Sequence, residues 1–474
     1  MSLATPPSTP TPPSNSFDAL PLSAAARNNL RRLGYLEMTA IQAASLPAAL
    51  QGRDLIAQAK TGSGKTAAFA LALLAKLNTR RFAVQALVLC PTRELADQVT
   101  TEIRRLARAE DNIKVVTLVG GVPLRGQTAS LEHGAHVVVG TPGRVMDHLE
   151  RGHLSLDALA TLVLDEADRM LDMGFADDIA TIARQCPIQR QTLLFSATYP
   201  EGIARLAAQF LRDPVTVKVQ AQHSSEQIEQ RWYEVREDQR LAAAANLLQH
   251  FRPTSTLAFC NTKLRCRELV SLLQAQGFDA LALHGDLEQR ERDQVLIRFA
   301  NGSCSVLVAT DVAARGLDVA GLAAVINVDI SPDPQAHVHR IGRTGRAGQS
   351  GLALSLASLD EMGAVGRIEQ LQGQPTVWQT LAELKPAPGG TLLPAMATVH
   401  IQAGRKDKIR PGDVLGALTA DLGYTREQVG KIDINEFATY VAVERSIAAA
   451  VVERLNQGRI KGRAVKARLL DSEL

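Results

Sequence analysis

The chain has 474 residues, of which 46% are hydrophobic, 21% charged and 4% aromatic, a composition typical of a soluble globular protein with two to four domains. Without a long apolar run, a signal pattern or cysteines at C-x-x-C spacing, we expect no membrane span, no secretion, no zinc site and no disulfide framework, and we place the protein in the cytoplasm. The net charge is +3, and this surplus lies in residues 395–474, which hold 13 Lys and Arg against 10 Asp and Glu.

The first half of the chain reads as a leader followed by an α/β domain. Residues 1–16 are rich in Pro, Ser and Thr, so we expect a disordered leader. Over residues 17–218, short and nearly continuous apolar runs alternate with amphipathic segments, which is typical of a parallel sheet covered on both faces. Strands are expected at 87–89, 115–118, 137–139 and 162–164.

A second α/β domain is expected over residues 219–384. The polar stretch from Gln220 to Gln230 predicts a linker, and the alternation then begins again. Strands are expected at 256–259, 280–283, 306–309 and 324–328. Residues 385–394 contain three prolines and two glycines and predict a second linker.

Residues 395–474 have a different pattern, with four expected strands and two expected helices. The strands are 398–402, 431–434, 439–443 and 465–470, and the helices are 414–421 and 446–455. The order β-α-β-β-α-β is that of a split βαβ sandwich. We therefore expect a small α+β domain at the end of the chain.

Residues 59–66 read Ala-Lys-Thr-Gly-Ser-Gly-Lys-Thr, directly after the apolar residues 55–57. Glycines let successive backbone N–H groups turn toward one anion, and the N-terminus of a following helix adds partial positive charge. In this pattern Lys65 reaches the outer phosphates of ATP, and the Thr66 hydroxyl binds Mg²⁺. The predicted phosphate cradle consists of Ala59, Thr61, Gly62, Ser63, Gly64, Lys65 and Thr66.

A phosphate loop needs acidic residues for its metal ion, and the apolar run 162–164 ends in Asp165-Glu166-Ala167-Asp168. We predict that Asp165 holds Mg²⁺, directly or through water. Glu166 is predicted to orient and activate the attacking water. Asp168 has an alternative role, because acids often cap helices.

The tetrapeptide 165–168 also resembles the signature of DEAD-box RNA helicases, and the resemblance extends from Phe17 to about Gly351. It implies two tandem RecA-like parallel-sheet domains that hydrolyse ATP to do work on RNA. Gly34-Tyr35, Thr39 and Gln42 resemble the adenine-recognition motif of this family, with Phe17 at its upstream aromatic position. The resemblance therefore adds Phe17, Tyr35, Thr39 and Gln42 to the ATP site.

Other motifs carry the same resemblance into both domains. It implies RNA-backbone contacts in the first domain at Pro91, Thr92, Arg93, Gly120, Gly121, Thr141, Pro142, Gly143 and Arg144. It gives Ser196, Ala197 and Thr198 the role of coupling hydrolysis to RNA. In the second domain, residues 309–318 and 339–346 resemble the motifs that close on the nucleotide, which implies Thr310 and Arg315 at RNA, Asp318 at ATP and His339 in coupling.

Arg343 and Arg346 are three residues apart, so both side chains are able to aim at one point. Phosphoryl transfer needs positioning and charge neutralisation more than covalent chemistry. We predict that these two arginines act as arginine fingers. Because ATP and RNA would each favour the same closed state, RNA is predicted to stimulate ATP hydrolysis.

The C-terminal domain has the expected topology of an RNA recognition motif but lacks its aromatic signature. Ala438 stands where a stacking aromatic is expected, and the first strand offers His400 but no Phe or Tyr. Basic residues instead gather in two groups, at Arg405, Lys406, Lys408 and Arg410, and at Arg459, Lys461, Arg463, Lys466 and Arg468. Of these, Arg405, Lys406, Lys408, Arg410, Lys461 and Arg463 are the predicted RNA contacts.

Residues 404–412 and 414–418 resemble the C-terminal domain of the bacterial DbpA helicases. The resemblance implies an anchor on a hairpin of 23S ribosomal RNA and work on pre-50S particles during large-subunit assembly. Two alternatives remain: an ATP-gated RNA clamp or chaperone of general RNA specificity, and a DNA translocase, which the basic tail disfavours. The sequence leaves the oligomeric state open.

Overall fold

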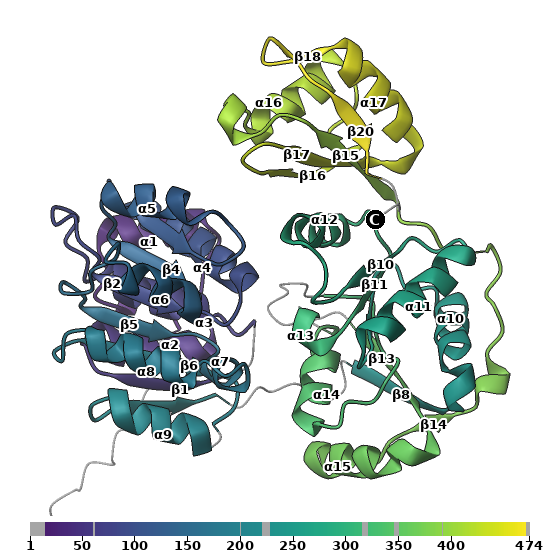
Figure 1. The fold of residues 1–474 in the computed structure, drawn as a ribbon, viewed down its shortest axis with the longest axis horizontal. Coiled ribbons are helices and arrows are strands. Elements are labelled where there is room, and N and C mark those ends of the chain that lie inside the picture. Colours follow the sequence, from purple (N-terminus) through teal and green to yellow (C-terminus); the bar gives the residue numbers. More distant parts are fainter. Residues whose placement is uncertain are drawn as a thin grey trace, which may run out of the picture. The chain divides into compact units, whose positions relative to one another are not determined.

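The computed structural model describes residues 15–59, 62–199, 201–219, 228–314, 321–345, 350–390 and 392–470, so nearly all of the expected leader lies outside the described residues. The chain divides near residue 222 into two compact units. Figure 1 shows the first unit in purple to teal and the second in teal to yellow. In these described ranges no helix is long and apolar enough to cross a membrane.

The first unit contains a seven-stranded parallel sheet in the order β3-β4-β2-β5-β6-β1-β7. Its strands are β1 Leu55–Gln58, β2 Ala86–Leu89, β3 Val115–Leu118, β4 Val137–Gly140, β5 Thr161–Leu164, β6 Gln191–Ser196 and β7 Val215–Lys218. Its helices are α1 Ala24–Arg32, α2 Ala40–Leu50, α3 Lys65–Leu74, α4 Arg93–Leu106, α5 Leu124–Glu132, α6 Pro142–Glu150, α7 Ala167–Asp172, α8 Ala176–Gln185 and α9 Glu201–Phe210.

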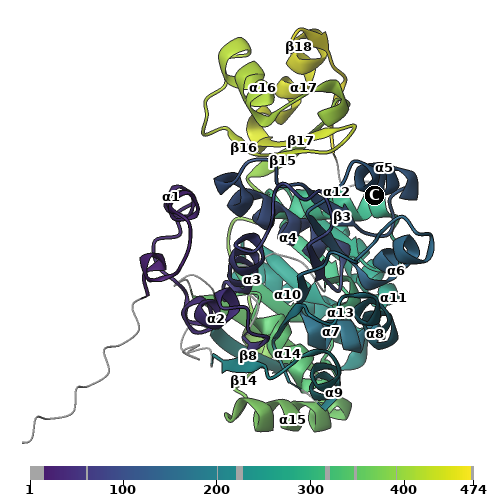
Figure 2. The same cartoon turned by 90° about the vertical axis from the view of Figure 1, so that its left-hand side faces the viewer.

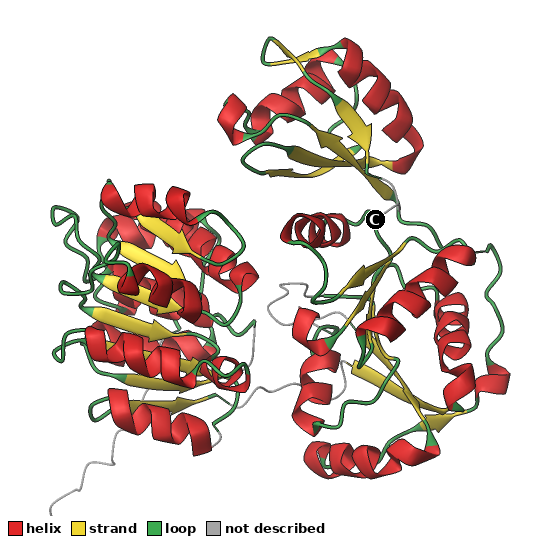
Figure 3. Cartoon of the chain, viewed as in Figure 1, coloured by secondary structure: helices red, strands yellow, loops and turns green. Residues whose placement is uncertain are grey.

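Two cores sandwich this sheet, because alternate residues of a strand point to opposite faces. In β2, Val88 packs with α1 to α4, whereas Leu87 and Leu89 pack with α6 to α9. Helices lie on both faces of the sheet in Figure 3. The apolar runs of the sequence are therefore buried strands of an α/β layer structure, as expected.

The second unit begins with another seven-stranded parallel sheet, in the order β10-β11-β9-β12-β13-β8-β14. Its strands are β8 Ile228–Glu234, β9 Thr256–Phe259, β10 Ala280–Leu283, β11 Val306–Ala309, β12 Ala324–Asn327, β13 Gly351–Ala357 and β14 Trp378–Gln379. Its helices are α10 Arg240–Phe251, α11 Lys263–Ala275, α12 Gln289–Ala300, α13 Asp311–Ala314, α14 Pro334–Ile341 and α15 Met362–Gln372.

One boundary prediction was wrong in this region. The expected linker extended to Gln230, but β8 already begins at Ile228 and pairs with β13. After Ile228 come three polar residues, Glu229 to Arg231, at exposed or partly exposed positions, so the start of this strand looks like a linker in the sequence.

The second unit ends in a four-stranded antiparallel sheet in the order β16-β17-β15-β20, with two helices on one face (Figure 2). The elements are β15 Met396–Ile401, α16 Pro411–Gly416, β16 Val429–Ile434, β17 Thr439–Glu444, α17 Ala448–Gln457 and β20 Ala467–Leu469. A π-helical turn over Ala417–Asp421 extends α16. The split βαβ prediction is thus confirmed.

A short hairpin, β18 Arg459–Ile460 and β19 Arg463–Ala464, was not predicted. The turn residues Lys461 and Gly462 both have positive φ, 52° and 79°, as a tight two-residue hairpin turn requires. The pair Lys-Gly is a weaker hairpin signal than Asn-Gly or Asp-Gly, which explains why the sequence reading missed it.

Helix α12 and the residues after it pack against the open face of this small sheet. Asn301 Nδ2 donates a hydrogen bond of 2.9 Å to Thr398 Oγ1, and Gln294 Nε2 lies 3.4 Å from the Tyr440 hydroxyl. Arg445 forms a 2.9 Å ion pair with Asp279 at the border of this contact. The C-terminal domain is therefore docked on the parallel-sheet domain that precedes it.

Replacing Asp279 with alanine is expected to destabilise the second unit by about 3–5 kcal/mol, because it deprives the buried Arg298 guanidinium of its carboxylate at 3.2 Å. The Arg445→Ala control removes a side chain that is 38% exposed and should cost about 1 kcal/mol or less. Urea denaturation of both variants measures the difference. Equal losses of unfolding free energy in the two variants would show that the buried pair with Arg298 is not the main contribution of Asp279 to stability.

Candidate nucleotide and nucleic-acid site

The predicted site residues of the first unit meet at one edge of its sheet, because the carboxyl ends of parallel strands share an edge. Asp165 follows the central strand β5. On one side of β5 lie β6, which ends at Ser196, and β1, which Ala59 follows. The predicted RNA residues follow β2, β4 and β3 on the other side. The sheet order thus separates the predicted nucleotide residues from the predicted RNA residues along one continuous edge, and we call these two parts the nucleotide half and the RNA half.

The phosphate cradle has the expected strand-to-helix form. Gly64 precedes α3 with φ of +93°, and Gly62 also has a positive φ. Lys65 is buried and donates from Nζ to Ala59 O at 2.8 Å. The buried Ser63 hydroxyl has no hydrogen-bond partner among the described residues. A cation, an unsatisfied hydroxyl and a helix N-terminus converge here, which fits a phosphate chain. Thr61 lies outside the described residues.

The predicted adenine-recognition residues touch this cradle directly. Gln42 Nε2 donates to Gly64 O at 3.1 Å, while Gln42 Oε1 accepts from Thr39 N at 2.9 Å. A Cβ on Gly64 would lie 2.6 Å from Gln42 Nε2, so this position needs glycine for space as well as for its φ. Phe17 packs edge-on against Tyr35, with ring centroids 6.4 Å apart.

The acidic segment is buried beside the cradle. Burial raises the pKa of Asp165 to about 7, although the nearby Lys65 opposes the shift. A buried carboxylate with this pKa needs further positive charge to remain ionised. A single carboxylate beside a phosphate cradle fits Mg²⁺, which binds through one or two carboxylates and shares phosphate oxygens. In the described residues no group of three or more His, Cys, Asp and Glu could hold a metal ion.

Glu166 has φ of +51°, which turns the chain sharply after β5. Its carboxylate forms an ion pair with Arg169, a partner that the sequence reading missed. The i, i+3 spacing of Glu166 and Arg169 on the edge of α7 was the available signal. This pairing holds the Glu166 side chain in a defined position.

Asp168 connects the acidic segment to the end of β6. Its Oδ2 accepts from both the backbone N and the Oγ1 of Thr198, each at 2.8 Å, and its backbone N donates to Ser196 Oγ at 3.3 Å. Burial alone would raise the pKa of Asp168, but these hydrogen bonds hold it below its usual value. Ser196 O in turn accepts from Ala59 N at 3.0 Å. Helix capping alone therefore does not explain Asp168.

The RNA half of the edge is built from tight turns and helix N-termini. Thr92 caps α4, and Thr141 and Pro142 begin α6. A Cβ on Gly121 would lie 1.8 Å from an Arg93 guanidinium nitrogen, so the glycine makes room for Arg93. Backbone N–H groups at helix N-termini favour anions such as phosphodiesters.

Two other positions on this half fit the same role. Arg144 donates to Val122 O at 3.1 Å and to Gln127 Oε1 at 3.3 Å, which fixes its guanidinium beside the edge. A Cβ on Gly143 would meet nothing within 4 Å. Packing within the protein therefore does not require glycine at Gly143, whereas the predicted close approach of an RNA backbone would.

In the second unit, Thr310 and Asp311 follow β11, and α14 carries His339 and Arg340. Arg340 is buried and binds both carboxylate oxygens of Asp311, at 2.7 and 2.6 Å. Arg340 thus joins the two predicted motifs of this unit, a role that the sequence reading did not assign. Arg343 is buried and His339 is exposed. Arg315, Asp318 and Arg346 lie outside the described residues.

The two basic groups of the C-terminal domain come together at its surface. Lys461 Nζ donates to Lys408 O at 2.9 Å and pairs with Asp413 at 3.3 Å, and Arg463 pairs with Asp407 at 2.9 Å. We call this surface the basic rim. It consists of Arg405, Lys406, Lys408, Arg410, Lys461 and Arg463, all exposed.

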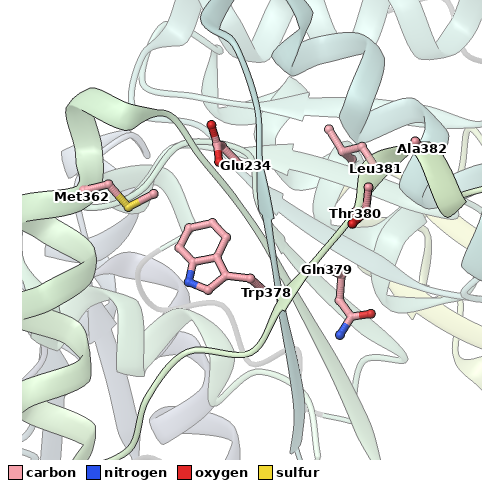
Figure 4. Close-up of a pocket in the computed structure, with 7 residues that line it drawn as sticks. All are labelled: Glu234, Met362, Trp378, Gln379, Thr380, Leu381 and Ala382. Atoms are coloured by element: carbon pink, nitrogen blue, oxygen red, sulfur yellow. The ribbon is translucent and has the colours of Figure 1, made fainter.

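A shallow cavity of about 630 Å³ lies elsewhere on the second unit (Figure 4). Its lining consists of Glu234, Met362, Trp378, Gln379, Thr380, Leu381 and Ala382. None of these is a predicted site residue, so this cavity does not contribute to the site described above.

Three family models match the chain in order. The DEAD/DEAH box helicase model matches residues 39–206, the helicase conserved C-terminal domain residues 239–348, and the DbpA RNA binding domain residues 398–469. The third match covers the domain that carries the basic rim.

Relatives and solved structures agree with these matches. The chain is 51% identical to the ATP-dependent RNA helicase DbpA of Escherichia coli K12, over 95% of this chain and 98% of that protein. It is 46% identical to the DEAD-box ATP-dependent RNA helicase CshA of Streptococcus pneumoniae TIGR4, over 75% and 68%. The structure resembles a single-substitution variant of Saccharomyces cerevisiae Dbp5 bound to RNA and ADP BeF3, with a TM-score of 0.72 and 30% identity over 78% of this chain and 97% of that one.

Proposed function

The chain belongs to the DEAD-box ATP-dependent RNA helicases of the DbpA type, and on this premise we propose that it remodels 23S ribosomal RNA in pre-50S particles during large-subunit assembly in the cytoplasm. The observation that supports the proposed ribosomal RNA target is the basic rim, which lies on a domain that matches the DbpA RNA binding domain. Helicase cores of this kind contact the backbone and shape of RNA rather than its sequence. Specificity for ribosomal RNA must therefore come from a domain outside the core.

For hydrolysis, four residues of the first unit have a proposed task. Lys65 neutralises charge on the outer phosphates, and Glu166 orients the attacking water from its fixed position beside Arg169. Thr66 and Asp165 would hold Mg²⁺, which would supply charge neutralisation at the phosphates. Arg343 and Arg346 add positive charge to the same phosphates as arginine fingers.

For RNA, the first unit binds the backbone at the helix N-termini that follow β2 and β4. Thr310 and Arg315 add contacts from the second unit. Thr198 donates two hydrogen bonds to the Asp168 carboxylate, and Asp168 N donates one to Ser196 Oγ, so the ends of β6 and β5 are linked. This link is the proposed route by which RNA binding affects the acidic segment.

Thr198→Ala removes one of the hydrogen bonds to the Asp168 carboxylate. Hydrogen bonds to charged groups contribute about 1.5–3 kcal/mol, so RNA-stimulated ATP turnover should fall about tenfold or more, while turnover without RNA stays unchanged. Thr192→Val on the same strand is the matched control, because the buried Thr192 hydroxyl has no partner among the described residues. An equal fall in both variants would argue against coupling through Asp168.

A clamp and a helicase share these residues, and strand separation distinguishes them. The test uses a short RNA duplex that flanks a 23S ribosomal hairpin, with ATP or with a non-hydrolysable analogue. We expect strand release with ATP alone, and faster release than from a duplex that flanks an unrelated hairpin. Stable binding without ATP-dependent release would favour the clamp instead.

A further inference from the structure

The sheet face on which an RNA recognition motif stacks bases is covered in this protein. Thr398, His400 and Tyr440 lie on that face and are only 2%, 3% and 4% exposed, because α12 and Asn301 pack against them. Burial lowers the pKa of His400, and the nearby Arg468 and Arg290 lower it further, so the ring is neutral at physiological pH. An RNA base has no access to these rings in the docked arrangement.

An exposed aromatic ring lies instead beside the basic rim. Phe437, in the turn between β16 and β17, is 64% exposed. Lys406 Nζ lies over its ring, 4.1 Å from the centroid, and also pairs with Glu436 at 2.9 Å. Among the described residues of the C-terminal domain, Phe437 is the one large apolar side chain that is exposed.

Backbone hydrogen bonds hold this turn against the basic segment. Arg405 N donates to Asn435 O at 2.9 Å, and Lys406 N donates to Glu436 O at 3.0 Å. Gly404 allows this approach, since a Cβ there would lie 2.6 Å from Ala438 N. The ring and the cations are therefore positioned together before any ligand binds, which reduces the entropy lost on binding.

We propose that Phe437, with Lys406 beside it, stacks an unpaired RNA base while the basic rim binds the adjacent phosphates. This proposal rests on the proposed function and adds a base contact to it. Aromatic rings beside cations are typical of single-stranded RNA sites. Six basic side chains outweigh the three nearby carboxylates, Asp407, Asp413 and Glu436, and a protein partner would favour a contiguous apolar patch rather than one ring among charges.

The experiment compares the full chain with Phe437→Ala and Phe437→Tyr. The probes are a 23S ribosomal RNA hairpin with an unpaired flank that carries 2-aminopurine, an unrelated hairpin with the same flank, and a blunt duplex of equal length. Phe82→Ala is the matched control, because Phe82 is 62% exposed on the first unit. Affinity is measured over a series of salt concentrations, and circular dichroism confirms that each variant is folded.

We expect Phe437→Ala to weaken binding of the unpaired RNA about tenfold and to abolish the quenching of 2-aminopurine, with no change in the salt dependence of affinity. Phe437→Tyr should bind within about twofold of the wild type, and Phe82→Ala should be unchanged. Lys406→Gln should reduce the salt dependence, because it removes a cation near the phosphates. Blunt-duplex affinity should be equal in wild type and Phe437→Ala.

Equal affinity of wild type and Phe437→Ala for the unpaired RNA would overturn the stacking proposal but not the proposed function. Binding of a protein partner would then be the remaining role for the exposed Phe437 ring. A wild-type chain that binds no RNA would overturn the proposed function as well. A tenfold loss seen equally with unrelated RNA would support stacking and contradict only the ribosomal target.

Discussion

Glu166→Gln is expected to lower the rate of ATP hydrolysis by about 100- to 10,000-fold, the range for loss of a positioned general base. The amide has nearly the same shape as the carboxylate but cannot accept a proton from water. Glu166 is buried, and its pairing with Arg169 fixes it at the end of the central strand. Steady-state turnover at saturating ATP and RNA measures the effect.

ATP and RNA affinity should change little in this variant, because the phosphate cradle and the RNA half of the edge are intact. Asp177→Asn, which alters an exposed acid at the start of α8, is the matched control and should keep wild-type turnover. Turnover of Glu166→Gln within a few-fold of the wild type would show that another group activates the water.

Arg343→Ala is expected to reduce turnover by about 1,000- to 100,000-fold, the range for an arginine finger. The proposed role of Arg343 is to neutralise charge that develops on the phosphates, so ATP binding should weaken far less than turnover. Single-turnover hydrolysis and nucleotide titration separate the two effects.

Arg340→Ala is the comparison variant for Arg343→Ala. Arg340 is bound bidentately by Asp311 and also donates to Asp329 O at 2.6 Å, so its loss should cost about 3–5 kcal/mol of stability. Urea denaturation and circular dichroism establish whether Arg343→Ala is folded under the conditions of the turnover assay. If Arg343→Ala retained turnover, or lost it only by unfolding, the finger assignment would be wrong.

The parts of the fold and site that the sequence predicted are those set by local pattern. The apolar runs 115–118, 256–259, 280–283 and 306–309 are strands with the expected bounds, because burial on both faces leaves an unmistakable continuous pattern. The phosphate cradle was equally local: Gly64 in a left-handed conformation ends the turn, and α3 begins at Lys65.

The parts that were missed depend on contacts between distant residues. Arg340 and Asp311 are 29 residues apart, and Asn301 and Thr398 are 97 residues apart. Local spacing in the sequence therefore predicts neither contact. The two basic groups were recognised separately, but only the fold joins Lys461 to Lys408 across 53 residues. Phe437 escaped notice because the expected stacking positions lay on the strands, whereas this residue lies in a turn.

RNA-dependent ATP hydrolysis directed at ribosomal RNA is tested by ATP turnover of the full chain with no RNA, with an unrelated structured RNA, and with a 23S ribosomal RNA fragment of equal length. We expect RNA to raise the rate, because ATP and RNA are proposed to favour the same state of the enzyme, and we expect the largest increase from the ribosomal fragment. The same rate in all three conditions would contradict this expectation.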